Sequence, residues 1–259
     1  MKKITKFLIT LTSVGSIVLI ATLNGSQLAV VGQPTPEVDG KPPTVPGGPR
    51  FIQPREDNLS PGDVPRTTRK AGQCVKGKLN LTALAPENRI GRTVSEYPVF
   101  FFYLPQTEGE LAEFVLLDQS GNQIYKQDVK ISNLSGVIGV SIPANQNVPP
   151  LEVGKSYTWK VSVVCDPNDR SGDLLESGVV RRVELSADIL RQLDQADPRQ
   201  KTVIYAENGI WQDALSTLAA ARQANLNDTE LAADWESLLD SVKLGEIAKE
   251  PIVPTQPQP

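Results

Sequence analysis

The chain has 259 residues, a formal net charge of −4 and no histidine. The lack of histidine excludes Ser-His-Asp and Cys-His nucleophile activation, and it excludes histidine-ligated zinc and haem. Two cysteines cannot build a four-cysteine metal site, so we expect no cofactor. An acidic chain without a large basic cluster lacks the electrostatic footprint of a nucleic-acid-binding protein, and we expect no such partner.

Residues 1–32 have the layout of a secretory signal peptide. Three lysines precede an apolar run, Phe7–Leu23, and small residues follow between Gly25 and Gly32. An uncleaved membrane anchor is the alternative, because the run is nearly long enough to span a bilayer. We therefore expect an exported protein of the periplasm or cell surface, which meets the membrane only through this segment if it stays attached.

Residues 33–70 are rich in proline, with nine between positions 33 and 66. Such a segment buries too little apolar surface to offset its ordering entropy, so we expect a disordered, semi-stiff tether. A ligand for a proline-recognition domain is the weaker alternative.

The stretch Leu151–Asp173 predicts a strand between a corner and a polar turn. From Tyr157 to Cys165, aromatic and aliphatic residues alternate with polar ones, which is the period of a half-buried strand. Leu151, Gly154 and Tyr157 have the spacing of a tyrosine corner, in which the hydroxyl bonds to upstream backbone. The corner resembles those of immunoglobulin-like and fibronectin-like sandwiches.

Six further strands are expected, and together they predict a β-sandwich domain over residues 71–186. The run YPVFFFYL is apolar on both faces and indicates a central strand. Ser120-Gly121-Asn122 marks a hairpin turn. The six expected ranges are 78–83, 97–104, 111–118, 123–129, 136–142 and 174–185.

Residues 187–250 predict a tail of three to four helices packed on the sandwich, followed by a disordered end at 251–259. Ser186 and Asp197-Pro198 are helix start signals, and Asn208-Gly209 marks a break between antiparallel helices. The fold class is therefore mainly β, an immunoglobulin- or fibronectin-like sandwich with an α-helical C-terminal part.

Gly209–Leu215 resembles the second-helix entrance of a tetratricopeptide repeat, although the first-helix signature is missing. The favoured interpretation is a helical hairpin docked on the sandwich, with Trp211 and Trp235 as packing anchors. The alternative is a truncated repeat that stacks on the repeats of a partner protein.

Cys74 and Cys165 predict a disulfide, because an oxidising compartment keeps two cysteines of an exported chain joined. A bridge closing a loop of about 90 residues stabilises the fold by roughly 4–5 kcal/mol in the chain-entropy model. A reactive thiol is disfavoured, because Asp166 beside Cys165 does not supply a positive surrounding.

The loop after Cys165 is the one dense polar cluster and holds the weak binding candidates Asp166, Asp169, Arg170 and Asp173. Its oxygens suit calcium, but the spacing misses that of an EF-hand. The favoured interpretation is a hairpin turn in which Asp169 or Asp173 pairs with Arg170 or Arg181. We assign no catalytic, cofactor-binding or metal-binding residue.

Several segments together resemble the domain of unknown function 928 family, found in cyanobacteria. The resemblance covers about residues 70–250 and brings no activity, cofactor or catalytic residue with it. The segments that carry it are LTALAPEN (81–88), FYLP (102–105), AEFVLLD (112–118), VCDPNDRS (164–171) and YAENGIWQDAL (205–215).

The expected function is that of an uncharacterised exported cell-envelope protein, a non-enzymatic module that binds a helical-repeat or envelope protein. One alternative is a sandwich that binds carbohydrate or envelope polymer. A second is a hydrolase that uses a carboxylate pair, for which the sequence places no two acids in one cleft.

Overall fold

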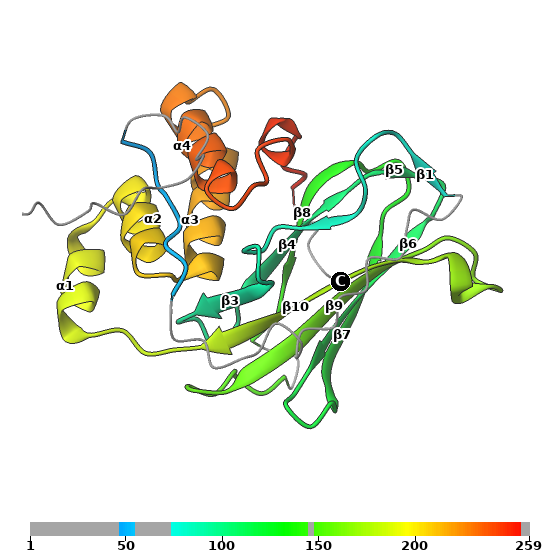
Figure 1. Cartoon of the computed structure of the whole chain (residues 1–259), viewed down its shortest axis with the longest axis horizontal. Coiled ribbons are helices and arrows are strands. Elements are labelled where there is room, and N and C mark those ends of the chain that lie inside the picture. The colour runs from blue at the N-terminus through cyan, green and yellow to red at the C-terminus, as the bar shows by residue number, and fades with distance from the viewer. Residues whose placement is uncertain (1–46, 55–73, 145–147, 255–259) are drawn as a thin grey trace, which may run out of the picture. The chain divides into compact units, whose positions relative to one another are not determined.

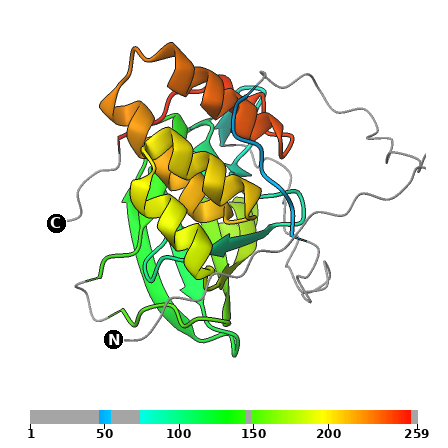
Figure 2. The same cartoon turned by 90° about the vertical axis from the view of Figure 1, so that its left-hand side faces the viewer.

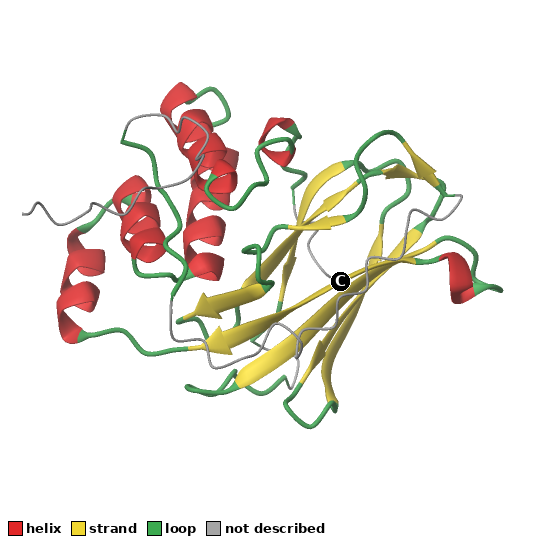
Figure 3. Ribbon diagram, in the orientation of Figure 1, coloured by secondary structure: helices red, strands yellow, loops and turns green. Residues whose placement is uncertain are grey.

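The computed structural model describes residues 47–54, 74–144 and 148–254. The predicted signal peptide lies outside the described residues, which form ten strands and four α-helices (Figure 1, Figure 3). The strands are β1 (Val75–Lys76), β2 (Thr82–Ala83), β3 (Ile90–Thr93), β4 (Val99–Leu104), β5 (Gln106–Thr107), β6 (Leu111–Leu117), β7 (Gln123–Lys130), β8 (Gly136–Ser141), β9 (Ser156–Val164) and β10 (Leu174–Arg182). The helices are α1 (Ala187–Gln195), α2 (Pro198–Glu207), α3 (Trp211–Ala224) and α4 (Thr229–Asp240), with short 3₁₀ turns at Arg170–Gly172 and Ile247–Lys249.

Two sheets pack face to face as a sandwich. One has the strand order β3-β10-β9-β6-β7 and the other the order β2-β4-β8. In β9 the predicted alternation is present, since Trp159 and Val161 are buried in the core between the sheets. The Phe100 ring from β4 lies 5.0 Å from that of Phe114 and 6.1 Å from that of Trp159, measured between centroids. The prediction of a mainly β fold with C-terminal helices is confirmed.

Strand β3 was not expected from the sequence. It pairs in parallel with the end of β10, from Val179 opposite Ile90 to Arg182 opposite Thr93, and so forms one edge of the larger sheet. The two-residue strands β1 and β5 pair separately. Ile90–Thr93 contains Gly91 and Arg92, so it lacks the alternation from which strands are recognised.

The smaller sheet is buried on both faces, as the composition of β4 indicated. Phe100, Phe102 and Leu104 point into the sandwich core. Tyr103, from the other face of β4, belongs to a second core shared with the helices. Figure 2 shows the helices lying in front of the sheets. Trp211 and Trp235 are both fully buried in this second core, and Trp211 Nε1 donates a 2.8 Å hydrogen bond to the Leu84 carbonyl.

Local signals set the ends of the helices. Ser186 caps α1, and Asp197 and Gln200 form a capping box around Pro198 at the start of α2. Gly209, between α2 and α3, has a φ of +71°. Glycine adopts this conformation readily because it has no Cβ. The predicted break at Asn208-Gly209 is therefore present.

The assignment of residues 33–70 to a disordered tether needs correction at residues 47–54. These residues run in an extended form along the helices, and Phe51 is 7% exposed. The physical reason is that one aromatic side chain and several backbone hydrogen bonds to the helices hold the segment. Composition does not reveal such partners.

Residues 251–254 require a second correction, because they were expected to be disordered. Val137 in β8 donates a 2.8 Å hydrogen bond to the Pro251 carbonyl and accepts one of 2.8 Å from Val253 N. Ile252 forms a parallel bridge with Val137, so this segment extends the free edge of β8. The proline-rich sequence is compatible with an edge position, where few backbone donors are needed.

Candidate functional sites

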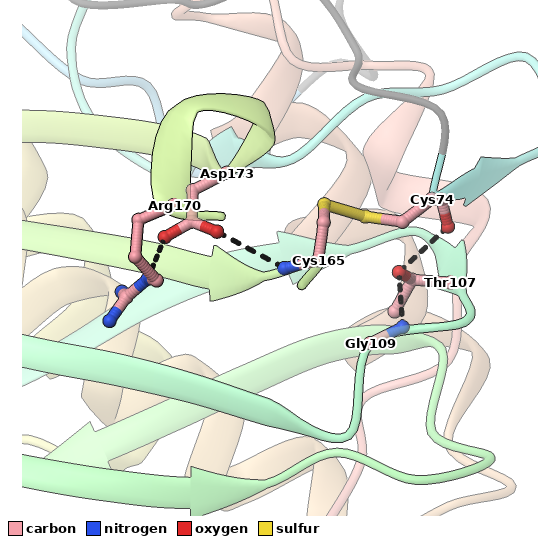
Figure 4. The surroundings of a disulfide bond; sticks show 6 residues. All are labelled: Cys74, Thr107, Gly109, Cys165, Arg170 and Asp173. Carbon is pink, nitrogen blue, oxygen red and sulfur yellow. Dashed lines mark hydrogen bonds and ion pairs between the residues drawn. A yellow bond between two sulfur atoms is a disulfide. The ribbon is translucent and has the colours of Figure 1, made fainter. Parts of the chain in front are cut away.

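The loop after Cys165 is a turn whose carboxylates accept hydrogen bonds from the same chain, as Figure 4 shows for Asp173. Asp173 accepts hydrogen bonds from Cys165 N at 3.1 Å and from Arg170 Nε at 2.5 Å. Asp169 caps the 3₁₀ turn through Ser171 N, and hydrogen bonds from Ser171 lower the Asp169 pKa. Asp166 accepts from Asn168 N at 2.8 Å. Within the described residues, no group of three or more potential side-chain ligands is arranged to hold a metal ion.

Arg170 also ties this turn to the outer face of the larger sheet. Its guanidinium lies 2.5 Å from Glu113 in β6, and the Glu113 carboxylate also binds Lys126 Nζ at 2.9 Å. The hydrogen bond from Arg170, followed by that from Lys126, lowers the Glu113 pKa. Sequence reasoning missed Glu113, because its partners come from the next strand and from a turn 57 residues away. The Arg170–Asp173 pair is one of those that the turn interpretation named.

The disulfide expected from the sequence is present between Cys74 and Cys165, with a Cα–Cα distance of 5.5 Å. Thr107 secures the Cys74 end, since its hydroxyl donates a 2.8 Å hydrogen bond to the Cys74 carbonyl and accepts one of 3.0 Å from Gly109 N (Figure 4). Both cysteines of the chain are bonded, so neither is a free thiol. The bridge joins the start of the sandwich to the end of β9.

The corner residues are also structural. Tyr157 Oη accepts a 2.9 Å hydrogen bond from Glu152 N, five residues upstream. Leu151 is buried, and Gly154 has a φ of +81°, which permits the tight bend. The exposed fraction of all three tryptophans, Trp159, Trp211 and Trp235, is 4% or less, so none offers a ring face for a sugar to stack on.

An open hollow of about 390 Å³ lies between α1 and α2. Leu193 is the one buried residue of α1, whereas Leu190, one turn earlier, is 52% exposed. Tyr205 from α2 adds an aromatic wall, and burial raises the pKa of its hydroxyl. The polar residues that line the hollow are Arg191, Asp194 and Lys201. The sequence offered the helical tail as a partner-binding surface through the truncated-repeat alternative, and it did not single out these residues.

The buried carboxylates near the helices are held by partners. Asp213, in the first turn of α3, accepts hydrogen bonds from Thr93 and Val94, and burial raises its pKa. Asp234 in α4 binds Arg199 through contacts of 2.6 and 3.1 Å. Glu176, in β10, forms an ion pair with Arg89. Each of these acids therefore binds a residue from a distant part of the chain.

These features define a disulfide-linked β-sandwich whose smaller sheet is covered by a helical layer. Residues 64–252 match the family described as Domain of Unknown Function (DUF928), and the chain therefore belongs to this family. The resemblance found in the sequence is confirmed. No curated protein matches the chain.

Proposed function

We propose that this protein is an exported, non-enzymatic interaction module that binds another protein through the hollow between α1 and α2. The observation that carries the proposal is that the exposed side chain of Leu190 and the aromatic side chain of Tyr205 line the same hollow. Protein-binding surfaces commonly place an apolar or aromatic centre inside a polar rim. Arg191, Lys201 and Asp194 also line the hollow and add charges of both signs.

Export is supported by two independent features. The N-terminal sequence has the layout of a secretory signal peptide, and disulfides persist mainly in oxidising compartments. Among the described residues, no helix is long and apolar enough to span a membrane. A partner in the cell envelope, itself built of helical repeats, suits a docking surface made from two helices.

The non-enzymatic part of the proposal is supported by the chemistry of the side chains. The chain has no histidine, and its two cysteines form the disulfide. The acids of the polar turn and of the helix–sheet junction bind cations or backbone amides within the chain. None of these groups is arranged as a nucleophile with an adjacent base.

The test is capture of partners by the exported, tagged full chain. Leu190→Glu places a charge in the lining of the hollow and should abolish capture of a specific partner without unfolding the chain, because Leu190 is already exposed. Val153→Glu is the matched control, because Val153 in the sandwich corner is also 52% exposed. Equal capture by wild type and Leu190→Glu would refute the proposed surface. Binding of glycans that survives Leu190→Glu would instead favour carbohydrate recognition by the sandwich.

A further inference from the structure

The helical layer contains a second surface, distinct from the α1–α2 hollow, that already holds an extended peptide. Residues Gly48–Pro54, which we call the strap, run across α2, α3 and α4 (Figure 1, Figure 2). Phe51 is the anchor. Its ring lies edge-on to the Trp211 ring, with 5.1 Å between centroids and an interplanar angle of 80°. This geometry is favourable for aromatic pairs, so the strap is seated by a specific contact.

Backbone hydrogen bonds fix the register of the strap on the helices. Ser237 Oγ donates to the Pro49 carbonyl at 3.1 Å, and Ser241 Oγ accepts from Phe51 N at 3.0 Å. Ile52 N donates to the Ala206 carbonyl near the end of α2 at 3.0 Å. These hydrogen bonds bind the main chain of the strap, and the Phe51 side chain supplies the apolar anchor. Grooves commonly recognise short extended peptides in this way.

Small residues allow the close fit at both ends of the strap. A Cβ at Gly48 would lie 2.7 Å from Ser237 Cβ, closer than such atoms approach one another. At the other end, a Cβ at Gly209 would lie 2.4 Å from Pro54 Cγ. The strap therefore needs a glycine at position 48, three residues before Phe51, and Gly209 leaves the space that Pro54 fills three residues after Phe51.

The groove and the strap come from different parts of the chain. All groove residues named above lie within residues 64–252, the range that matches the family, whereas the strap precedes it. Nineteen residues, 55–73, separate the strap from the start of the sandwich. The strap therefore binds the groove as a peptide ligand would, although residues 55–73 connect the two in one chain.

We propose that this groove is a peptide-binding site for segments of the type Gly-Pro-x-Phe-x-x-Pro, and that the strap of a second copy of the chain occupies it by exchange. The same contacts form within one chain and between two chains, so exchange loses no interaction in the groove. Nineteen residues, at no more than about 3.3–3.6 Å each, reach about 60–70 Å, which is enough to extend to a neighbouring copy. Exchange should therefore grow with protein concentration, and each copy contributes Phe51 to the groove of the other.

The test uses the oxidised full chain in two differently tagged forms. After the two forms are mixed at high concentration and incubated, capture through one tag should recover the other form, and light scattering should detect a dimer. Phe51→Ala removes the anchor from the closed monomer and from the exchanged dimer alike, so the open chain should replace both forms and the recovered fraction should fall at least tenfold. Ile52→Ala is the matched control, because Ile52 is 56% exposed and its backbone bond is kept. A chain that stays monomeric at all concentrations, with no cross-capture, would overturn the proposal.

A competition experiment covers the case in which Phe51→Ala impairs folding. An excess of a capped synthetic peptide of residues 47–54 should dissociate the wild-type dimer, and the same peptide with alanine for Phe51 should not. A dimer that resists the peptide, or that forms equally well with Phe51→Ala, is held by another surface and would also overturn the proposal. Leu190→Glu should leave this dimer unchanged, so the exchange and the proposed partner surface are tested separately.

Discussion

Asp213 Oδ2 accepts a 2.8 Å hydrogen bond from Thr93 Oγ1, and this contact joins α3 to the edge strand β3. The same oxygen accepts from Val94 N at 3.1 Å, and Thr93 is fully buried. The helical layer is thus pinned to the larger sheet as well as packed on the smaller one. Removal of the acceptor leaves two donors without partners, which costs about 1–3 kcal/mol for each one that stays buried.

The buried position of Asp213 predicts a stability that falls as pH rises. Burial raises the pKa above its ordinary value of 3.8, so the folded chain binds more protons than the unfolded chain between the two values. Asp213 therefore stabilises the fold most below about pH 3.8 and loses that contribution as pH rises through the folded pKa. Asp213→Asn keeps an acceptor for both donors and has no such pH dependence.

Urea unfolding of wild type and Asp213→Asn at pH 4 and pH 7 checks this prediction. The stability of the variant relative to wild type should increase with pH. Asp213→Ala separates the charge from the hydrogen bonds, because it should be less stable than wild type at both pH values. If the difference in the free energy of unfolding between Asp213→Asn and wild type did not change with pH, the raised pKa of Asp213 would be contradicted.

Glu113 predicts the opposite pH dependence. Arg170 and Lys126 lower its pKa below the ordinary 4.5, so its contribution is present above that value and is lost as pH falls through the folded pKa. Glu113→Gln should cost about 0.5–1 kcal/mol near pH 7, because both cations are partly exposed and the pairs are screened by water. The cost should shrink toward pH 3 and in high salt. A cost unchanged by salt would show that packing, and not charge, is lost.

The disulfide predicts a large loss of stability on reduction. The bridge spans 91 residues, and in the chain-entropy model a loop of that size contributes about 4–5 kcal/mol. Replacing both Cys74 and Cys165 by serine should lower the free energy of unfolding by about that amount. A reducing agent should lower the stability of wild type to a similar extent and leave the double variant unchanged, which calorimetry with and without reductant would show.

The sequence predicted the parts of the fold that depend on local pattern. The two-faced apolar run of β4, the alternation in β9 and the start signals at Ser186 and Asp197 all correspond to elements of the structure. Strand β3 was missed because a four-residue strand has too short a pattern, and its parallel partner lies about 90 residues later. The role of Asp213 was invisible for the same reason, since it depends on β3.

The candidate sites were less predictable, because each depends on contacts between distant segments. The polar turn was recognised, but the pairing of Arg170 with Glu113 depends on the neighbouring strand. Phe51 is the one aromatic residue in the proline-rich segment 33–70, and its partners Trp211 and Ser241 lie 160 or more residues away. Composition therefore indicated a tether where the structure has a bound segment. The exposure of Leu190 is likewise decided by how α1 packs on α2.

Gly178 in β10 predicts a strong effect of a single methyl group. The indole of Trp159 lies across this glycine, and a Cβ there would be 2.4 Å from Trp159 Cζ2 and 2.9 Å from the Arg89 carbonyl oxygen. Trp159 is 4% exposed and packs near Phe100, so its ring has little room to move. Gly178→Ala should therefore overpack the core and destabilise the chain by about 1–3 kcal/mol.

Gly172→Ala is the matched control for this substitution. Gly172 lies in the 3₁₀ turn before β10, and a Cβ there meets no atom within 4 Å. The free energy of unfolding of Gly172→Ala should therefore stay within about 0.5 kcal/mol of that of wild type, as for most surface substitutions. Urea unfolding followed by tryptophan fluorescence measures both variants, and Gly178→Ala should also change the emission of Trp159. If Gly178→Ala were as stable as wild type, the prediction would be wrong. The close contacts of the added Cβ with Trp159 and the Arg89 carbonyl would then relax at little cost.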